Sequence, residues 1–154
     1  MNGLKANWPP SARRSNEFSK GPMSTPVKHH SPGFLALVQD AKGRIREIEI
    51  NEYKRMRERG DAGQLVDVRE DHEWNLAHAA GAIHLSKGTI ERDIETAFPD
   101  KNTKLVLYCG GGYRSALATD NLQKMGYTNV ISLDGGWRAI EASGLPLEQG
   151  AGTV

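Results

Sequence analysis

The sequence predicts an α/β fold, in which helices cover both faces of a mainly parallel central sheet. Short apolar runs that end in polar residues recur along the chain, as they do in buried parallel strands. These runs occupy residues 64–68, 82–85, 104–108 and 129–133. Helical patterns separate them and occupy residues 71–78, 89–98 and 115–125. Short connections between alternating strands and helices favour a parallel sheet.

The N-terminal segment is predicted to lie outside this sheet. Five of the seven prolines fall within residues 1–32, where apolar residues show no periodicity, so we expect a disordered tail there. Residues 33–43 predict an appended amphipathic helix, because apolar residues recur there at helical spacing. These apolar residues are Phe34, Leu37, Val38 and Ala41.

The folded domain is predicted to span residues 44–148, with a C-terminal tail over residues 149–154. Isoleucines alternate with charged residues at its start and predict a short edge strand. They are Ile45, Ile48 and Ile50. Asn51 is expected to begin the next helix, which ends at Gly60.

The helix over residues 115–125 has a clear buried side and a clear end. Ala118, Leu122 and Met125 lie at helical spacing and predict the side that packs on the sheet. Gly126 follows where a left-handed C-cap is favourable.

Composition and charge narrow the classes of function. The net charge is +1, and most of the excess positive charge lies in the N-terminal tail, so the domain gives no basic surface for nucleic acid. No apolar run approaches the roughly 18 residues that cross a bilayer. The N-terminus also lacks the apolar segment of a secretory signal. We therefore expect a cytoplasmic protein without nucleic-acid or membrane partners.

The stretch "YCGGGYRSA" is the strongest candidate for chemistry. Cys109, the one cysteine of the chain, directly follows the strand over residues 104–108. Ligands of α/β sheets bind at the carboxyl ends of parallel strands. The three glycines that follow can turn backbone N–H groups inward, and the next helix and Arg114 add positive charge. These features stabilise an anion, so Cys109 is predicted to be a nucleophilic thiolate.

A structural role for Cys109 is the alternative. Buried, inert cysteines are common, and three glycines can simply form a tight turn. The combination of a strand end, a glycine loop, an arginine and a helix start favours the nucleophile.

Four segments of the chain resemble the rhodanese family of sulfurtransferases, in particular its single-domain bacterial-type members. They are "VDVREDHEW" at residues 66–74, "AHAAGAIHL" at 77–85, "LVLYCGGGYRSALA" at 105–118 and "LDGGWRAIEASGLPLE" at 133–148. The chain departs from the family at Ala77 and Ala80, where glycine and proline are usual. These two positions belong to a turn rather than to the cysteine loop.

The resemblance implies a rhodanese-like fold and a sulfur-transfer reaction with Cys109 as catalytic residue. The implied substrate-binding loop consists of Gly110, Gly111, Gly112, Tyr113 and Arg114. Thiosulfate or a persulfide would donate sulfur, cyanide or a thiol would accept it, and one cysteine suffices for such two-step transfer. A sulfur-relay protein is a further candidate partner.

Two other functions stay open. Related phosphatases and arsenate reductases place five residues between cysteine and arginine, whereas four separate Cys109 from Arg114, which leaves a smaller loop. A non-catalytic interaction module is the second alternative, although such domains have typically lost the cysteine.

Some polar residues are expected to support the loop. Asp67 and Arg69 end a strand at the same sheet edge, where they could brace it through charge-assisted hydrogen bonds. Lys87 and Arg92 could attract an anionic donor. His78 is expected to form a hydrogen bond within its turn. No pair of histidines has metal-binding spacing on a helix, so the sequence predicts neither a metal nor a cofactor.

Overall fold

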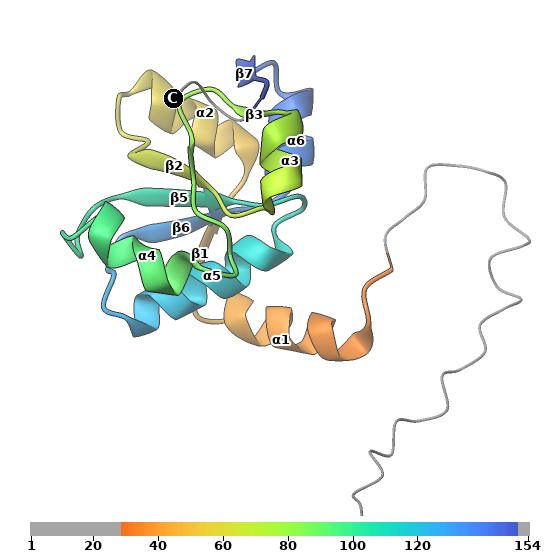
Figure 1. The fold of residues 1–154 in the computed structure, drawn as a ribbon, viewed down its shortest axis with the longest axis vertical. Helices are drawn as coiled ribbons and strands as arrows, with labels where there is room; N and C mark the ends of the chain where they lie inside the picture. The colour runs from red at the N-terminus through yellow and green to blue at the C-terminus, as the bar shows by residue number, and fades with distance from the viewer. Residues whose placement is uncertain (1–28, 151–154) are drawn as a thin grey trace, which may run out of the picture. The chain divides into compact units, whose positions relative to one another are not determined.

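The computed structural model describes residues 29–150. The chain divides into the units Met1–His30 and Ser31–Val154, and all helices and strands of residues 29–150 belong to the second unit (Figure 1). The tail expected over residues 1–32 falls outside the described residues except at its end. The same holds for residues 151–154 of the expected C-terminal tail.

The core of the second unit is a five-stranded sheet in which all neighbouring strands are parallel, in the order β1-β6-β5-β2-β4. The strands are β1 Arg46–Ile48, β2 Gln64–Asp67, β4 Ile83–His84, β5 Leu105–Tyr108 and β6 Val130–Leu133. This arrangement confirms the mainly parallel sheet, and β1 is an edge strand as predicted.

Helices cover both faces of the sheet (Figure 1). The helices α4 (Ile90–Ala97) and α5 (Tyr113–Lys124) cover one face, and α2 (Ile50–Glu58) and α6 (Gly136–Ala142) cover the other. Residues of β5 alternate between the two cores: Leu105 and Leu107 pack with α4 and α5, whereas Val106 and Tyr108 pack with α2 and α6. Strands buried on both sides explain the continuous apolar runs in the sequence.

The helix α1 (Pro32–Lys42) packs against α5, close to the position expected for the appended helix. Val38 and Ala41 are buried, whereas Leu37 keeps 56% of its surface exposed. A helix that rests on one neighbouring helix buries only a narrow stripe. In the loop after α1, Arg44 donates hydrogen bonds to both carboxylate oxygens of Asp120 on α5, at 3.0 and 2.8 Å.

Several boundaries differ from the sequence-based expectation. The helix α2 begins at Ile50 after the N-cap Glu49, rather than at Asn51. The helix α3 (Asp71–Leu76) ends early because the chain enters the strand β3 (His78–Ala79), which pairs antiparallel with β7 (Leu147–Glu148). Two-residue strands show no periodicity, so neither β3 nor β7 was predicted. The buried stripe at Ala118 and Leu122 is confirmed, as is the left-handed glycine after α5.

No helix within residues 29–150 combines the length and the apolar composition of a membrane span.

Candidate active site

The cysteine thiol lies at the carboxyl end of β5, under the first turn of α5. Cys109 continues the side-chain alternation of Leu105 and Leu107, so its sulfur points toward the α5 face, and only 1% of its surface is exposed. The backbone N–H of Gly112 donates a hydrogen bond to Sγ at 3.1 Å. Gly112 has a φ of +101°, which other residues rarely adopt. The glycine thus places this N–H over the sulfur.

A pair of buried hydroxyls lies on the other side of the sulfur. Ser115 Oγ is 3.5 Å from Cys109 Sγ and 2.9 Å from Ser132 Oγ on β6. Both serines are fully buried. The Cys109 thiol donates to Ser115 Oγ, and either of the two serine hydroxyls can donate to the other. A deprotonated sulfur would have no proton to donate and could accept from the Ser115 hydroxyl instead. Among the described residues, one backbone N–H, that of Gly112, donates to the sulfur, rather than the several N–H groups expected from three glycines.

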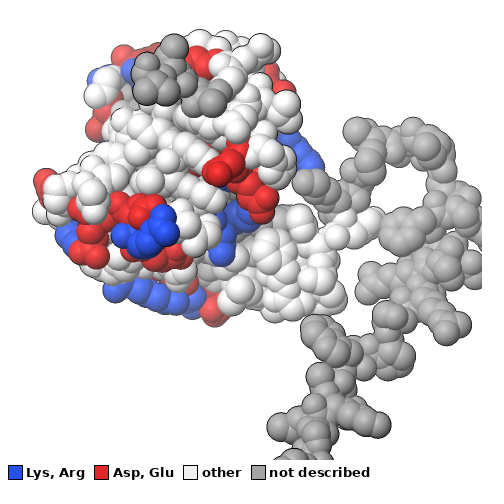
Figure 2. Space-filling model, viewed as in Figure 1, with Lys and Arg blue, Asp and Glu red and all other residues white. Residues whose placement is uncertain are grey.

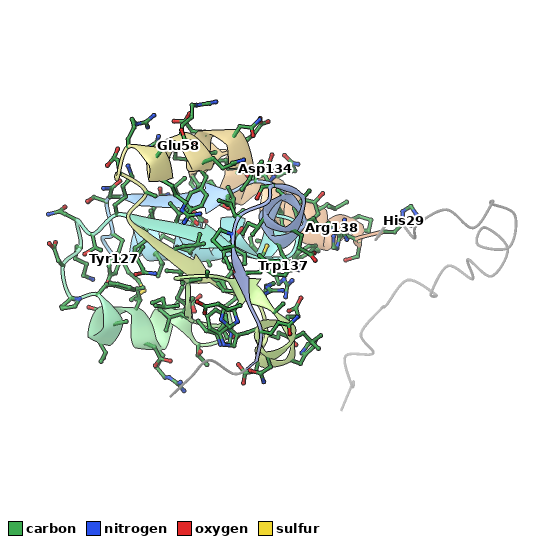
Figure 3. The ribbon with its side chains drawn as sticks, turned by 90° about the horizontal axis from the view of Figure 1, so that it is seen from above. His29, Glu58, Tyr127, Asp134, Trp137 and Arg138 are labelled. Carbon is green, nitrogen blue, oxygen red and sulfur yellow. The ribbon has the colours of Figure 1, made fainter. Side chains whose placement is uncertain are left out.

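The N-terminal end of α6, which carries Trp137 and Arg138 (Figure 3), holds the backbone of the loop. Trp137 N–H donates to the carbonyl oxygen of Cys109 at 2.6 Å, and Arg138 N–H donates to that of Gly110 at 3.3 Å. Gly136 makes this approach possible, because a Cβ at this position would overlap the Cys109 carbonyl. The "LDGGW" segment therefore orients the residue that carries the thiol.

Arg114 forms an ion pair that the sequence did not predict. Its guanidinium donates to both carboxylate oxygens of Glu73 on α3, at 2.7 and 3.1 Å, and lies over Gly110. Glu73 also accepts a hydrogen bond from the N–H of Glu70. The Arg114 hydrogen bonds lower the pKa of Glu73 to about 2. Glu73 is therefore ionised at neutral pH and balances much of the positive charge that we expected Arg114 to offer the thiol.

Tyr113 contributes its backbone to the loop and its ring to α1. The ring lies edge-on to Phe34, with centroids 6.2 Å apart, and the amine of Lys42 lies 5.4 Å from its centre. The appended helix therefore contacts the Tyr113 side chain of the cysteine loop through Phe34 and Lys42.

Asp67 and Arg69 form a buried pair with hydrogen bonds of 2.8 to 3.1 Å. Arg69 also donates to the carbonyl of Ala77 at 2.7 Å, and its guanidinium lies 4.4 Å from the centre of the Trp137 ring. The guanidinium also lies 5.7 Å from the centre of the Tyr108 ring. Any support for the loop is therefore indirect, through Tyr108, which precedes Cys109, and through Trp137, whose N–H holds the Cys109 carbonyl.

Two aromatic rings lie beside this pair. His78 Nδ1 contacts the carbonyl oxygen of Trp74 at 2.9 Å, which confirms the expected hydrogen bond within the turn. The His78 ring stacks on the Trp74 ring. Within residues 29–150, no group of three histidine, cysteine, aspartate or glutamate side chains is arranged to hold a metal ion.

An open hollow of about 640 Å³ adjoins the loop. It is lined by Val68, residues 70–72, residues 86–88 and Arg114. Lys87, one of the two cations expected to attract an anionic sulfur donor, is part of this lining. The other, Arg92, lies outside it and donates to Asp93 at 2.7 Å. Acidic and basic side chains lie close together on the face of the molecule seen in Figure 2.

Three residues of the site, Glu73, Ser115 and Ser132, were not predicted from the sequence. For Glu73 and Ser132 the sequence contains a pattern that could have indicated their roles. Glu73 follows Glu70 by three residues, a spacing typical of helix N-termini. Ser132 is a polar residue inside the apolar run "NVISL", which indicates a buried hydrogen-bonding partner. Ser115 follows Arg114 directly but carries no signal of its own.

The fold and the site define an α/β protein with a buried thiol held by a glycine loop at a strand end. Residues 49–143 match the family described as Rhodanese-like domain, and the chain belongs to that family. The chain is 37% identical over 74 residues to thiosulfate sulfurtransferase PspE of Escherichia coli (strain K12), covering 48% of this chain and 71% of PspE. It is 34% identical over 101 residues to thiosulfate sulfurtransferase GlpE of Vibrio cholerae serotype O1, covering 66% of this chain and 92% of GlpE.

One solved structure is similar along its whole length. It is a Rhodopseudomonas palustris protein described as of unknown function and a possible tyrosine phosphatase. The TM-score is 0.69 at 26% identity, over 80% of this chain and 100% of the other.

Proposed function

We propose that the protein is a sulfurtransferase, which carries a sulfane sulfur from thiosulfate or a persulfide to cyanide or a thiol as a persulfide on Cys109. The observation that carries this proposal is the environment of the sulfur, which faces the Gly112 N–H at 3.1 Å and the Ser115 hydroxyl at 3.5 Å. Both donors favour a negatively charged sulfur, before and after it has taken up a second sulfur atom. Relatives named thiosulfate sulfurtransferase support the same reaction.

The proposed cycle has two steps. In the first, the Cys109 thiolate attacks the outer sulfur of the donor; a new S–S bond forms, the donor's own bond to that sulfur breaks, and sulfite or a thiolate leaves with the electron pair. In the second step, cyanide or a thiolate attacks the terminal sulfur, and the Cys109 thiolate leaves. No oxidant or reductant is needed, because each S–S bond broken is replaced by a new bond to sulfur.

The remaining residues have proposed roles around this step. The backbone of Gly110, Gly111 and Gly112, with Tyr113 and Arg114, forms the substrate-binding loop. Asp67 and Arg69 act as supporting residues. We propose a cytoplasmic setting, because a reducing compartment keeps an unpaired thiol available. A relative named putative sulfur carrier protein YrkF, of Bacillus subtilis, agrees with a sulfur-relay partner.

Phosphatase activity is a second candidate, which the description of the Rhodopseudomonas palustris protein brings forward. A phosphate ester needs donors for three oxygens around the cysteine. In this chain four residues separate Cys109 from Arg114, and the Arg114 guanidinium already binds Glu73 in two places. A single sulfur atom suits this smaller loop better than a phosphate group.

Intact-mass spectrometry tests the proposal. Incubation with thiosulfate should add one sulfur atom to the wild type, and cyanide should remove it as thiocyanate. Cys109→Ser should remain unmodified with an unchanged circular dichroism spectrum, whereas Ser86→Ala, which changes a hydroxyl in the hollow, should still take up sulfur. A sulfur adduct on Cys109→Ser would refute the assignment. Hydrolysis of p-nitrophenyl phosphate without any adduct would favour the phosphatase, and neither activity would favour an interaction module.

A further inference from the structure

The appended helix α1 brings a lysine next to the cysteine loop. Lys42 is the last residue of α1, and the helix lies before the residues 49–143 that match the rhodanese-like family. The Lys42 side chain keeps 19% of its surface exposed. A lysine that has lost most of its contact with water is normally paired with groups that compensate its charge. The partners of Lys42 therefore indicate what the helix contributes to the site.

The amine of Lys42 lies among groups from three parts of the fold. Its Nζ is 3.2 Å from Glu47 Oε2 on β1 and 3.9 Å from Asp134 Oδ1, in the turn between β6 and α6. The centre of the Tyr113 ring, in the first turn of α5, lies 5.4 Å from the same nitrogen. Lys42 thus connects α1 with both the cysteine loop and the turn before α6.

The Asp134 carboxylate packs on the glycine that binds the sulfur. A Cβ on Gly112 would lie 3.3 Å from Asp134 Oδ1 and 3.3 Å from the backbone nitrogen of Gly135. The same Oδ1 accepts a hydrogen bond from the Gly135 N–H at 3.1 Å. Asp134 also precedes the end of α6 that holds the Cys109 carbonyl (Figure 3). The oxygen that attracts Lys42 is therefore an atom that limits where Gly112 can lie.

Tyr113, the residue after Gly112, is restrained by the same helix. Its ring contacts both the Phe34 ring and the Lys42 amine, and an aromatic face attracts a cation. Three consecutive glycines have more backbone freedom than other residues, so contacts from outside the loop decide where their N–H groups point. Contacts of this kind reach Gly112 from the Asp134 side and from the Tyr113 side.

The charge of Lys42 is already balanced. Among the described residues, Glu47 and Asp134 are its ion-pair partners, so two negative charges face one positive charge. Arg114 is likewise paired with a carboxylate. These charges leave no surplus with which Lys42 could stabilise a thiolate directly.

We propose that Lys42 is a positioning residue for sulfur transfer. By holding Asp134 and Tyr113, it keeps the N–H of Gly112 directed at the sulfur. This N–H donates to Sγ at 3.1 Å and favours its charged form. The inference rests on the proposed sulfurtransferase function and adds to its site a residue from outside the family match. Without the Lys42 amine, the glycine loop gains freedom and the hydrogen bond to the sulfur weakens.

Lys42→Met tests the inference, because it removes the amine and keeps most of the side-chain volume. The rate of Cys109 alkylation by iodoacetamide, measured against pH, should shift to higher pH, since the thiolate loses part of a hydrogen bond that stabilises it. The single-turnover rate of persulfide formation at saturating thiosulfate should fall about tenfold, as expected for one weakened hydrogen bond to a charged group. Lys42→Arg keeps the charge and should restore most of both properties.

Arg44→Ala is the matched control for the docking of α1. Arg44 also connects the end of α1 to the domain, through hydrogen bonds of 3.0 and 2.8 Å to Asp120, but Asp120 lies about two turns along α5 from the cysteine loop. This variant should lower the free energy of unfolding in urea and leave the alkylation profile unchanged. A shift equal to that of Lys42→Met would overturn the inference, because loss of helix docking would then explain both. An unshifted profile in Lys42→Met would also overturn it.

Asp134→Asn tests the same contact from the other side and decides the question if Lys42→Met does not fold. The amide keeps an oxygen for the Gly135 N–H but loses the charge that attracts Lys42, so the alkylation profile should again shift to higher pH. A direct effect of charge would shift it to lower pH, because a negative charge near the thiolate is removed; that result, or no shift, would overturn the inference. Alkylation does not require sulfur transfer. If thiosulfate forms no persulfide on the wild type, the proposed function fails, and the alkylation profiles still decide the role of Lys42.

Discussion

Replacing Gly136 by alanine tests how the end of α6 holds the cysteine loop. Gly136 has a φ of +48°, where a side chain costs roughly 1 kcal/mol. The added Cβ would also overlap the Cys109 carbonyl, so α6 must move away and its hydrogen bonds from Trp137 and Arg138 must weaken. Two lost backbone hydrogen bonds cost about 1–3 kcal/mol together. The expected decrease in the free energy of unfolding is therefore about 2–4 kcal/mol.

Gly144→Ala is the matched control for the backbone cost. Gly144 also has a positive φ, +78°, but a Cβ there would meet no atom within 4 Å. The Gly144→Ala variant should lose only about 1 kcal/mol of its free energy of unfolding. Urea unfolding followed by circular dichroism gives both free energies, and thiocyanate formation from thiosulfate gives the activity of each variant under folding conditions. Gly136→Ala should lose at least tenfold in activity, and Gly144→Ala should lose little.

The reasoning would be refuted if Gly136→Ala destabilised the protein no more than Gly144→Ala. It would also be refuted if Gly136→Ala were destabilised as expected but kept full activity. In the second case the contact would stabilise the fold without orienting the thiol.

Two further predictions concern the contacts of the loop. Glu73→Gln should remove part of the pH dependence of the free energy of unfolding. Folding lowers the pKa of Glu73 from 4.5 to about 2. The ion pair with Arg114 therefore stabilises the protein fully above pH 4.5, and this stabilisation is lost as the pH falls toward 2. That pKa difference corresponds to ~3 kcal/mol, and solvent contact at both side chains reduces the expected contribution to about 1–2 kcal/mol. The free energy of unfolding is measured for the wild type and for Glu73→Gln as the pH is lowered. The same pH dependence in both proteins would contradict the prediction. Ser115→Ala should slow sulfur transfer about tenfold, because it removes a hydroxyl that can donate to the charged sulfur. Ser132→Ala, one hydrogen bond further from the sulfur, should have the smaller effect. Single-turnover rates measure both variants, and a larger effect of Ser132→Ala would exclude a direct role for Ser115.

The main elements of the sheet were predictable because their burial leaves a simple pattern. The apolar runs "LVDV" and "KLVLY" are buried on both faces, so almost every residue is apolar. By contrast, β3 and β7 are two residues long and exist because segments about 70 residues apart in the chain pair with each other. A contact between distant segments leaves no local periodicity, so local reasoning could not find this pair.

The same distinction applies to the candidate site. Cys109, its glycines and Arg114 are neighbours in sequence, and the strand end and helix start around them could be recognised together. Glu73 and Ser132 come from other elements, 41 residues before Arg114 and 17 residues after Ser115. Their partners were unknown before the strands were placed side by side.

The sequence by itself determined the class of fold, the position of the thiol at a strand end and the family resemblance, because each depends on residues close together in the chain. Only the tertiary structure decided that Glu73 neutralises Arg114, that Gly136 lets α6 hold the Cys109 carbonyl, and that Lys87 rather than Arg92 lines the hollow. These properties depend on distances between side chains from different elements. Such distances are set by packing, and packing is a property of the whole folded domain.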